Sequence, residues 1–246
     1  MSILTNFGKY VILIFRIFSK PEKTRIYLKQ TVREIENLGV NSIGIVIIIS
    51  IFIGAVITLQ TRYNLESSWI PLYLIGLTAR DTILLEFSST MVGLILAGKV
   101  GSNIASEIGH MRITEQIDAL EMMGINSAGY LILPKIIAAM IFNPFLTIIS
   151  MVIGIFGGWL AAIVTGALSS ADYIYGIQYW FEPFYITYAL VKTVVYAFII
   201  TSVSAFYGYY VKGGALEVGR SSTKGVVYSC ILILMFDVIL TQLMLA

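Results

Sequence analysis

Charged residues, cysteine and histidine are all scarce in this chain. Of its 246 residues, 12% are charged, whereas an ordinary soluble domain has about 25%. The single cysteine, Cys230, cannot form an internal disulfide, and the single histidine, His110, excludes a metal site built from several histidines of this chain. Apolar residues make up 58% of the chain and the mean hydropathy is +0.87. The composition therefore indicates an integral membrane protein.

The N-terminal residues do not have the pattern of a cleavable signal peptide. Lys9 and Arg16 bracket a short apolar core, and no small-residue cleavage pattern follows. Residues 2–18 instead gather Phe7, Tyr10 and other apolar side chains on one helical face, with polar ones opposite. We expect an interfacial helix along the membrane surface, the alternative being a short buried or frayed segment.

Windows of about 20 residues predict five membrane spans. The third contains Pro134 and Pro144 and is too long for one upright crossing, so we expect a tilted, kinked helix. The expected fold is a single all-α domain over residues 1–246, with spans at residues 42–59, 82–108, 131–164, 185–210 and 226–245.

Basic residues set the expected orientation. They concentrate before the first span and recur between spans two and three and between spans four and five, while the segment between spans three and four has none. The positive-inside rule therefore predicts a cytoplasmic N-terminus and a C-terminus outside.

Small residues recur every fourth position in two spans. Such ridges let helices approach backbone to backbone. We favour close packing within one protomer, and a self-association face is the alternative. The ridges comprise Gly93, Ala97, Gly101, Ala105 and Gly109 in span two, and Gly154, Gly158, Ala162 and Gly166 in span three.

The segment between the second and third spans is charged and amphipathic. Glu115, Asp118 and Glu121 recur at helical spacing beside apolar residues such as Ile117. We expect a helix over residues 112–124 with nothing to bury against within this chain, and therefore available to a soluble partner. This layout is typical of a transporter driven by a separate motor.

Two near-matches to catalytic motifs are set aside. Residues 93–100, GLILAGKV, almost fit the phosphate loop G-x-x-x-x-G-K-[ST], but Val100 replaces the hydroxyl and a helix leaves no N–H groups free for an anion. Ser106 and His110 lie four apart, yet no G-x-S-x-G surrounds Ser106. An intramembrane hydrolase is therefore a weak alternative.

Charged residues inside predicted spans include Glu86 in span two, Lys192 in span four and Asp237 in span five. Each costs about 2.5–3.5 kcal/mol at the bilayer centre, so each should face the protein interior or a wet cavity. We expect Lys192 to approach at least one carboxylate. The cluster either governs a cavity or couples movement, or it is a plain structural ion pair.

The run GKVGSNIASEIGHMRITEQIDALEMMGIN, residues 98–126, resembles the signature of the MlaE-type permeases of lipid ABC transporters. The resemblance extends upstream over KPEKTRIYLKQTVREIENLGVNSI and downstream over LVKTVVYAFIITSVSAFYGYYV and FDVILTQLML. The chain departs from the family at Lys99, where arginine is frequent, and at Leu85, where a basic residue is frequent.

The resemblance implies a homodimer in the bacterial inner membrane that moves phospholipid, without nucleic acid. Cytoplasmic ABC ATPase subunits would bind ATP and Mg²⁺, so this chain itself would hold no cofactor or metal and perform no catalysis. A periplasmic MCE-domain lipid-binding protein would sit on the outer side. The rival reading is a stand-alone proton-coupled carrier that uses the three intramembrane charges as a relay.

The resemblance also assigns roles to three groups of residues. The residues matching Glu86, Lys192 and Asp237 are functionally important in the family. The ATPase-coupling residues would be Glu115, Gln116, Asp118, Ala119 and Glu121. The lipid pocket would map to Val56, Leu59, Gln60 and Tyr63.

Overall fold

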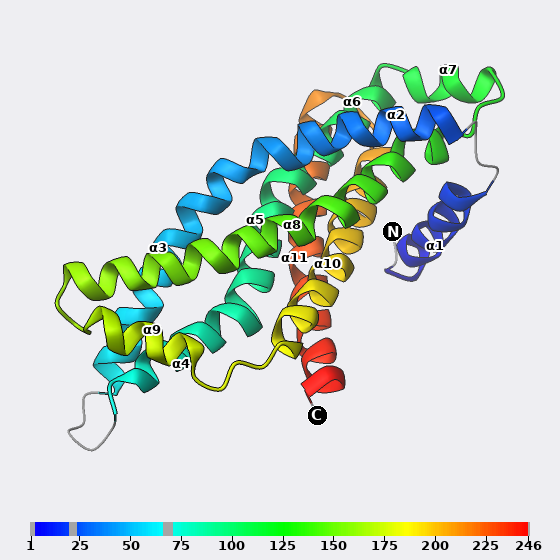
Figure 1. Cartoon of the computed structure of the whole chain (residues 1–246). Helices are drawn as coiled ribbons and strands as arrows, with labels where there is room; N and C mark the ends of the chain where they lie inside the picture. Colours follow the sequence, from blue (N-terminus) through cyan, green and yellow to red (C-terminus); the bar gives the residue numbers. More distant parts are fainter. Residues whose placement is uncertain (1–2, 20–23, 66–70, 246) are drawn as a thin grey trace. The chain divides into compact units, whose positions relative to one another are not determined.

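The computed structural model describes residues 3–19, 24–65 and 71–245, and every regular element within those ranges is a helix (Figure 1). Five helical stretches are long and apolar enough to cross a membrane: Tyr27–Asn64, Tyr73–Ile113, Ser127–Val164, Phe184–Tyr209 and Ala215–Leu245. The all-α membrane fold and the five spans are confirmed. Four of the spans are longer than predicted, and Ser2 of the predicted interfacial helix lies outside the described residues.

The chain divides into two compact units. One draws on Met1–Asn41, Gly93–Asn143 and Val194–Ala246, the other on Ser42–Val92 and Pro144–Thr193. Helices α8 (Ser127–Val164) and α10 (Phe184–Tyr209) each contribute to both units. Helix α8 continues without a break through both of its prolines, and the predicted kink stays a prediction.

The second unit is built around close contact between α3 (Ile43–Asn64) and the C-terminal half of α8. A Cβ on Gly54 would collide with the Gly154 carbonyl. The small-residue ridge of span three therefore packs within the chain, which is the alternative favoured from the sequence. The unit also contains α4 (Tyr73–Thr82), the π-helical segment η3 (Ile83–Met91) and α9 (Ser170–Gln178).

Arg80 of α4 fixes the connection that follows α9. Its side chain is buried and donates hydrogen bonds to the carbonyl groups of Ile177, Tyr179 and Trp180 at 2.6, 2.9 and 3.3 Å. The guanidinium also pairs with Asp81 at 2.7 Å. A buried arginine is therefore compensated by the C-terminal carbonyls of a helix, where a positive charge is favourable.

The first unit packs the ridge of span two against neighbouring helices. A Cβ on Gly101 would lie 2.8 Å from the Ser204 hydroxyl of α10, which confirms close packing within the chain for this ridge too. The unit contains α1 (Ile3–Phe18), α2 (Thr24–Glu34), η1 (Ile35–Gly39), η2 (Val40–Ser42, which ends in the second unit), α5 (Val92–Leu96, which begins there), η4 (Ala97–Gly101), α6 (Ser102–Ile113), α7 (Gln116–Met122) and α11 (Ala215–Leu245).

Helix α1 buries a narrow line of side chains and exposes a broad apolar face. Leu13 and Ile17 are buried, and the Tyr10 hydroxyl lies 2.8 Å from the Ser202 hydroxyl of α10. Phe7 and Phe15 are among the exposed apolar side chains. A helix is present where it was expected, and its interfacial character and place at the membrane surface stay predictions.

Candidate functional site

Two of the three predicted intramembrane charges form an ion pair in the second unit. The Lys192 ammonium of α10 lies 3.0 and 3.1 Å from the two carboxylate oxygens of Glu86 in η3. It also donates to the Tyr188 hydroxyl at 2.9 Å, which in turn donates to Glu86 at 3.3 Å. Thr90 donates to the other Glu86 oxygen at 3.3 Å. The expectation that Lys192 approaches a carboxylate is confirmed.

The two partners differ sharply in burial. The Lys192 side chain is 0% exposed, whereas the Glu86 side chain is 40% exposed on the surface of the chain. A carboxylate inside a membrane span avoids lipid tails because its transfer into hydrocarbon is costly. The exposed edge of Glu86 therefore calls for water or a polar partner beside this helix.

Asp237 of α11 belongs to the first unit. Its carboxylate accepts a hydrogen bond of 2.6 Å from the Tyr196 hydroxyl of α10. The hydroxyl satisfies one lone pair of a charge that lies within the span Ala215–Leu245. Sequence reasoning did not find Tyr196, because a tyrosine within an apolar run is usually a packing residue.

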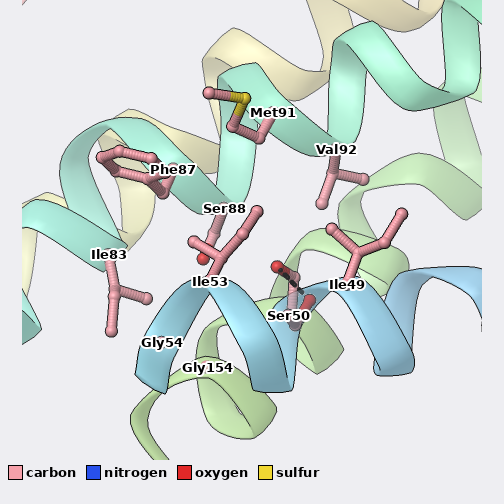
Figure 2. A pocket seen from close by; sticks show the side chains of 11 residues that line it. Ile49, Ser50, Ile53, Gly54, Ile83, Phe87, Ser88, Met91, Val92 and Gly154 are labelled. Atoms are coloured by element: carbon pink, nitrogen blue, oxygen red, sulfur yellow. Dashed lines mark hydrogen bonds between the residues drawn. The ribbon is translucent and has the colours of Figure 1, made fainter. Parts of the chain in front are cut away.

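A small cavity in the second unit lies between α3, η3 and α8 (Figure 2). The Ser50 hydroxyl donates to Ser150 at 2.8 Å inside it, and the buried Ser88 hydroxyl has no partner among the described residues. Its volume is about 10 Å³, which suffices for about one water molecule. This cavity is too small for a phospholipid.

The predicted helix over residues 112–124 is broken in the structure. Helix α6 ends at Ile113, and α7 covers only Gln116–Met122. Between them Glu115 adopts the left-handed conformation, with φ of 60°, which L-residues rarely adopt. Glu115 and Gln116 therefore stand at a sharp turn, and the helix proper is shorter than predicted.

Helix α7 is held by the chain, contrary to the expectation that it has nothing to bury against. Ile117 is fully buried. A single Glu121 oxygen accepts hydrogen bonds from Arg16 and Tyr209 at 2.8 Å and from Ser127 at 2.7 Å. These contacts tie α7 to α1, α8 and α10. Glu121 is thus an internal anchor of α7.

The same contacts explain the acidity of Glu121. Burial alone would raise the pKa of its carboxyl, but the hydrogen bonds from Ser127 and Tyr209 and the Arg16 guanidinium outweigh burial and lower the pKa. Asp118 pairs instead with Arg112 at 2.6 Å. The surface of α7 that remains open includes Met122 and Met123, which are 90% and 66% exposed.

The four residues predicted to bind lipid share one exposed face of α3. Val56, Leu59, Gln60 and Tyr63 recur at i, i+3, i+4 and i+7, which places them on one side of a helix, and all four are exposed. Their accessibility agrees with the predicted role, which stays a prediction.

The structure supports neither the phosphate-loop near-match nor the Ser106–His110 pair as a catalytic site. Residues 93–100 lie in α5 and η4, so the backbone of the phosphate-loop near-match is helical. Ser106 and His110 lie one turn apart on α6, and within the described part of the chain no hydrogen bond joins them.

Comparison with known proteins gives a consistent result. The family model described as permease MlaE matches residues 31–243. A probable ABC transporter permease protein of Rickettsia bellii is 36% identical, covering 97% of this chain and 92% of that protein. The chloroplastic protein trigalactosyldiacylglycerol 1 of Arabidopsis thaliana is 30% identical over 89% of this chain and 63% of that protein. The intermembrane phospholipid transport system permease protein MlaE of Haemophilus influenzae is 29% identical over 99% and 98%.

Proposed function

The chain belongs to the MlaE permease family, and we propose that it is the membrane subunit through which an ABC system moves phospholipid. Membership makes it a multi-pass permease whose family role is non-catalytic. The phospholipid cargo is supported by the name of the Haemophilus influenzae relative, an intermembrane phospholipid transport system permease. The chain would act in a bacterial inner membrane, with its N-terminus in the cytoplasm and its C-terminus in the periplasm.

The observation that carries the proposal is the half-exposed Glu86 carboxylate paired to a fully buried Lys192. It supplies a polar edge within a membrane span. A lipid carrier needs this combination, because the headgroup requires polar partners and the tails require an apolar wall. Beside η3 one chain holds a cavity of only about 10 Å³, so a second copy would complete a cavity of lipid size, with Val56, Leu59, Gln60 and Tyr63 on its wall.

The energy source would be a separate ATPase that docks on α7. Met122 and Met123 present flexible apolar side chains suited to a groove on a partner. Glu115, Gln116, Asp118 and Ala119 surround them on the exposed side. Glu121 would dock through its second carboxylate oxygen, because the first already accepts hydrogen bonds within the chain. The ATPase would hold ATP and Mg²⁺, and a periplasmic MCE-domain protein would exchange lipid on the other side.

Co-purification tests the ATPase assignment. The full-length chain, expressed with a candidate ABC ATPase from its own organism, should retain that ATPase through detergent purification. Replacing Met122 and Met123 by serine should release it, whereas Glu217→Gln, on the exposed start of α11, should not. Lipid transport by a preparation that contains no ATPase and follows a pH gradient would favour the proton-coupled carrier instead.

A further inference from the structure

A polar cavity of about 320 Å³ lies in the first unit between α2, η1, α6 and α8. Its volume is in the range of small-ligand pockets, about 300–1,000 Å³. In the structure Lys135 lies within α8, and the cavity wall also carries Gln30, Arg33, Glu34 and Glu107.

The cavity contains more fixed negative than positive charge at its centre. The Lys135 side chain is 4% exposed, and its ammonium lies 2.8 Å from carboxylate oxygens of both Glu34 and Glu107. One ammonium between two carboxylates leaves an excess of one negative charge. Glu107 is 45% exposed, so its carboxylate can still accept hydrogen bonds from a molecule in the cavity.

A further acceptor in the wall has no partner. The Gln30 side-chain oxygen is buried and makes no hydrogen bond within the described residues. Such an acceptor is satisfied by an N–H or O–H donor. Arg33 lies on the same face of α2, is exposed, and brings a positive charge to the cavity. The wall thus carries both hydrogen-bond acceptors and an exposed cation.

The cavity lies near the ends of three membrane spans. The first span begins, the second ends and the third begins on one membrane face, because consecutive spans alternate in direction. A helix rises about 1.5 Å per residue. Along its helix axis, Lys135 therefore lies about 12 Å from the start of α8 at Ser127. Glu107 lies about 9 Å from the end of α6 at Ile113. At 38 residues, α8 is about 57 Å long and exceeds the full bilayer of about 40–45 Å.

We infer that this cavity binds the headgroup of an aminophospholipid. The primary ammonium donates hydrogen bonds to the Gln30 oxygen and to Glu107, and the phosphate lies toward Arg33. A choline headgroup has no N–H group and leaves the Gln30 oxygen unpaired. The inference does not require phospholipid to be the transported cargo, because every membrane protein is surrounded by lipid.

Stepwise methylation of the headgroup tests the inference on the native chain. Delipidated full-length protein is titrated with phosphatidylethanolamine, its monomethyl and dimethyl derivatives, and phosphatidylcholine with identical acyl chains, and binding is measured by native mass spectrometry. Affinity should fall at each methylation, by about tenfold overall, as hydrogen bonds from a charged donor are lost. Equal affinity for all four lipids would overturn the inference.

Variants locate the site and separate the two sources of the headgroup. Gln30→Leu and Glu107→Gln should each reduce the preference for phosphatidylethanolamine, and the surface control Glu217→Gln should keep it. An unchanged preference in both cavity variants overturns the assignment. Free phosphoethanolamine at the same concentration should not displace the lipid, and displacement would show a site for a soluble amine instead. If either variant fails to fold, the methylation series on the native chain decides.

Discussion

The burial asymmetry of the Glu86–Lys192 pair predicts unequal effects of its two single substitutions. Glu86→Gln removes the carboxylate from an ammonium that is 0% exposed. Breaking a buried pair in this way costs about 3–5 kcal/mol, because the remaining charge has no access to water. Lys192→Met leaves a carboxylate that is 40% exposed and still accepts from Tyr188 and Thr90. Its cost should be about 1–3 kcal/mol, the value of lost hydrogen bonds to a charge.

Chemical unfolding of the full-length chain in mixed micelles measures these differences. The double substitution should recover most of the loss caused by Glu86→Gln, with a coupling free energy above about 1 kcal/mol. The same variants separate stability from transport, since Lys192→Met should fold and yet move lipid slowly. Equal losses for the two single variants, or a double variant that equals their sum, would refute the reasoning from burial.

The remaining predictions concern α7 and the α3–α8 contact. Glu121→Gln should destabilise the chain near neutral pH, because the pKa of Glu121 is lowered in the folded chain. The contribution of Glu121 to the free energy of unfolding is full above its unfolded pKa of about 4.3. That contribution is lost as the pH falls through the folded pKa. A destabilisation by Glu121→Gln that persists unchanged at strongly acid pH would contradict this. Serine at both Met122 and Met123 should leave unfolding within about 0.5 kcal/mol of the parent while abolishing ATPase retention, and a retained ATPase would contradict it. Gly54→Leu should prevent folding because the Gly154 carbonyl occupies the space of a side chain, and normal yield with native-like unfolding would contradict it.

The membrane spans were predictable because long apolar runs leave no other stable location for the chain. The errors concern span ends. Helix α11 begins at Ala215, well before the predicted residue 226. The prediction missed its first turns because they carry charged residues such as Glu217 and Arg220. A hydropathy window excludes such polar turns, although they continue the same helix beyond the lipid.

The candidate site was predictable in its residues and not in its geometry. The cost of an unpaired charge in lipid is enough to expect Lys192 beside a carboxylate. The π-helical turn that carries Glu86, and the exposure of its carboxylate, depend on packing between segments far apart in the sequence. A single sequence contains no signal for either.

The coupling segment shows the same limit. Periodicity predicted a continuous helix over residues 112–124, since nothing in the local sequence marks Glu115 for a left-handed turn. Two of the three partners of Glu121, Arg16 and Tyr209, lie more than 80 residues away along the chain. Their approach follows from the tertiary fold, and it gives Glu121 a structural role that the sequence did not predict.

Reconstituted lipid transfer tests the central claim most directly. The chain and its ATPase are placed in proteoliposomes that contain labelled phospholipid, and transfer to acceptor vesicles is followed with and without ATP. ATP-dependent transfer that requires this chain, and that falls when Lys192 is replaced by methionine, is the predicted result. Transfer at the same rate without ATP, or with Lys192→Met at the parental rate, would contradict the account of an ATP-driven phospholipid permease.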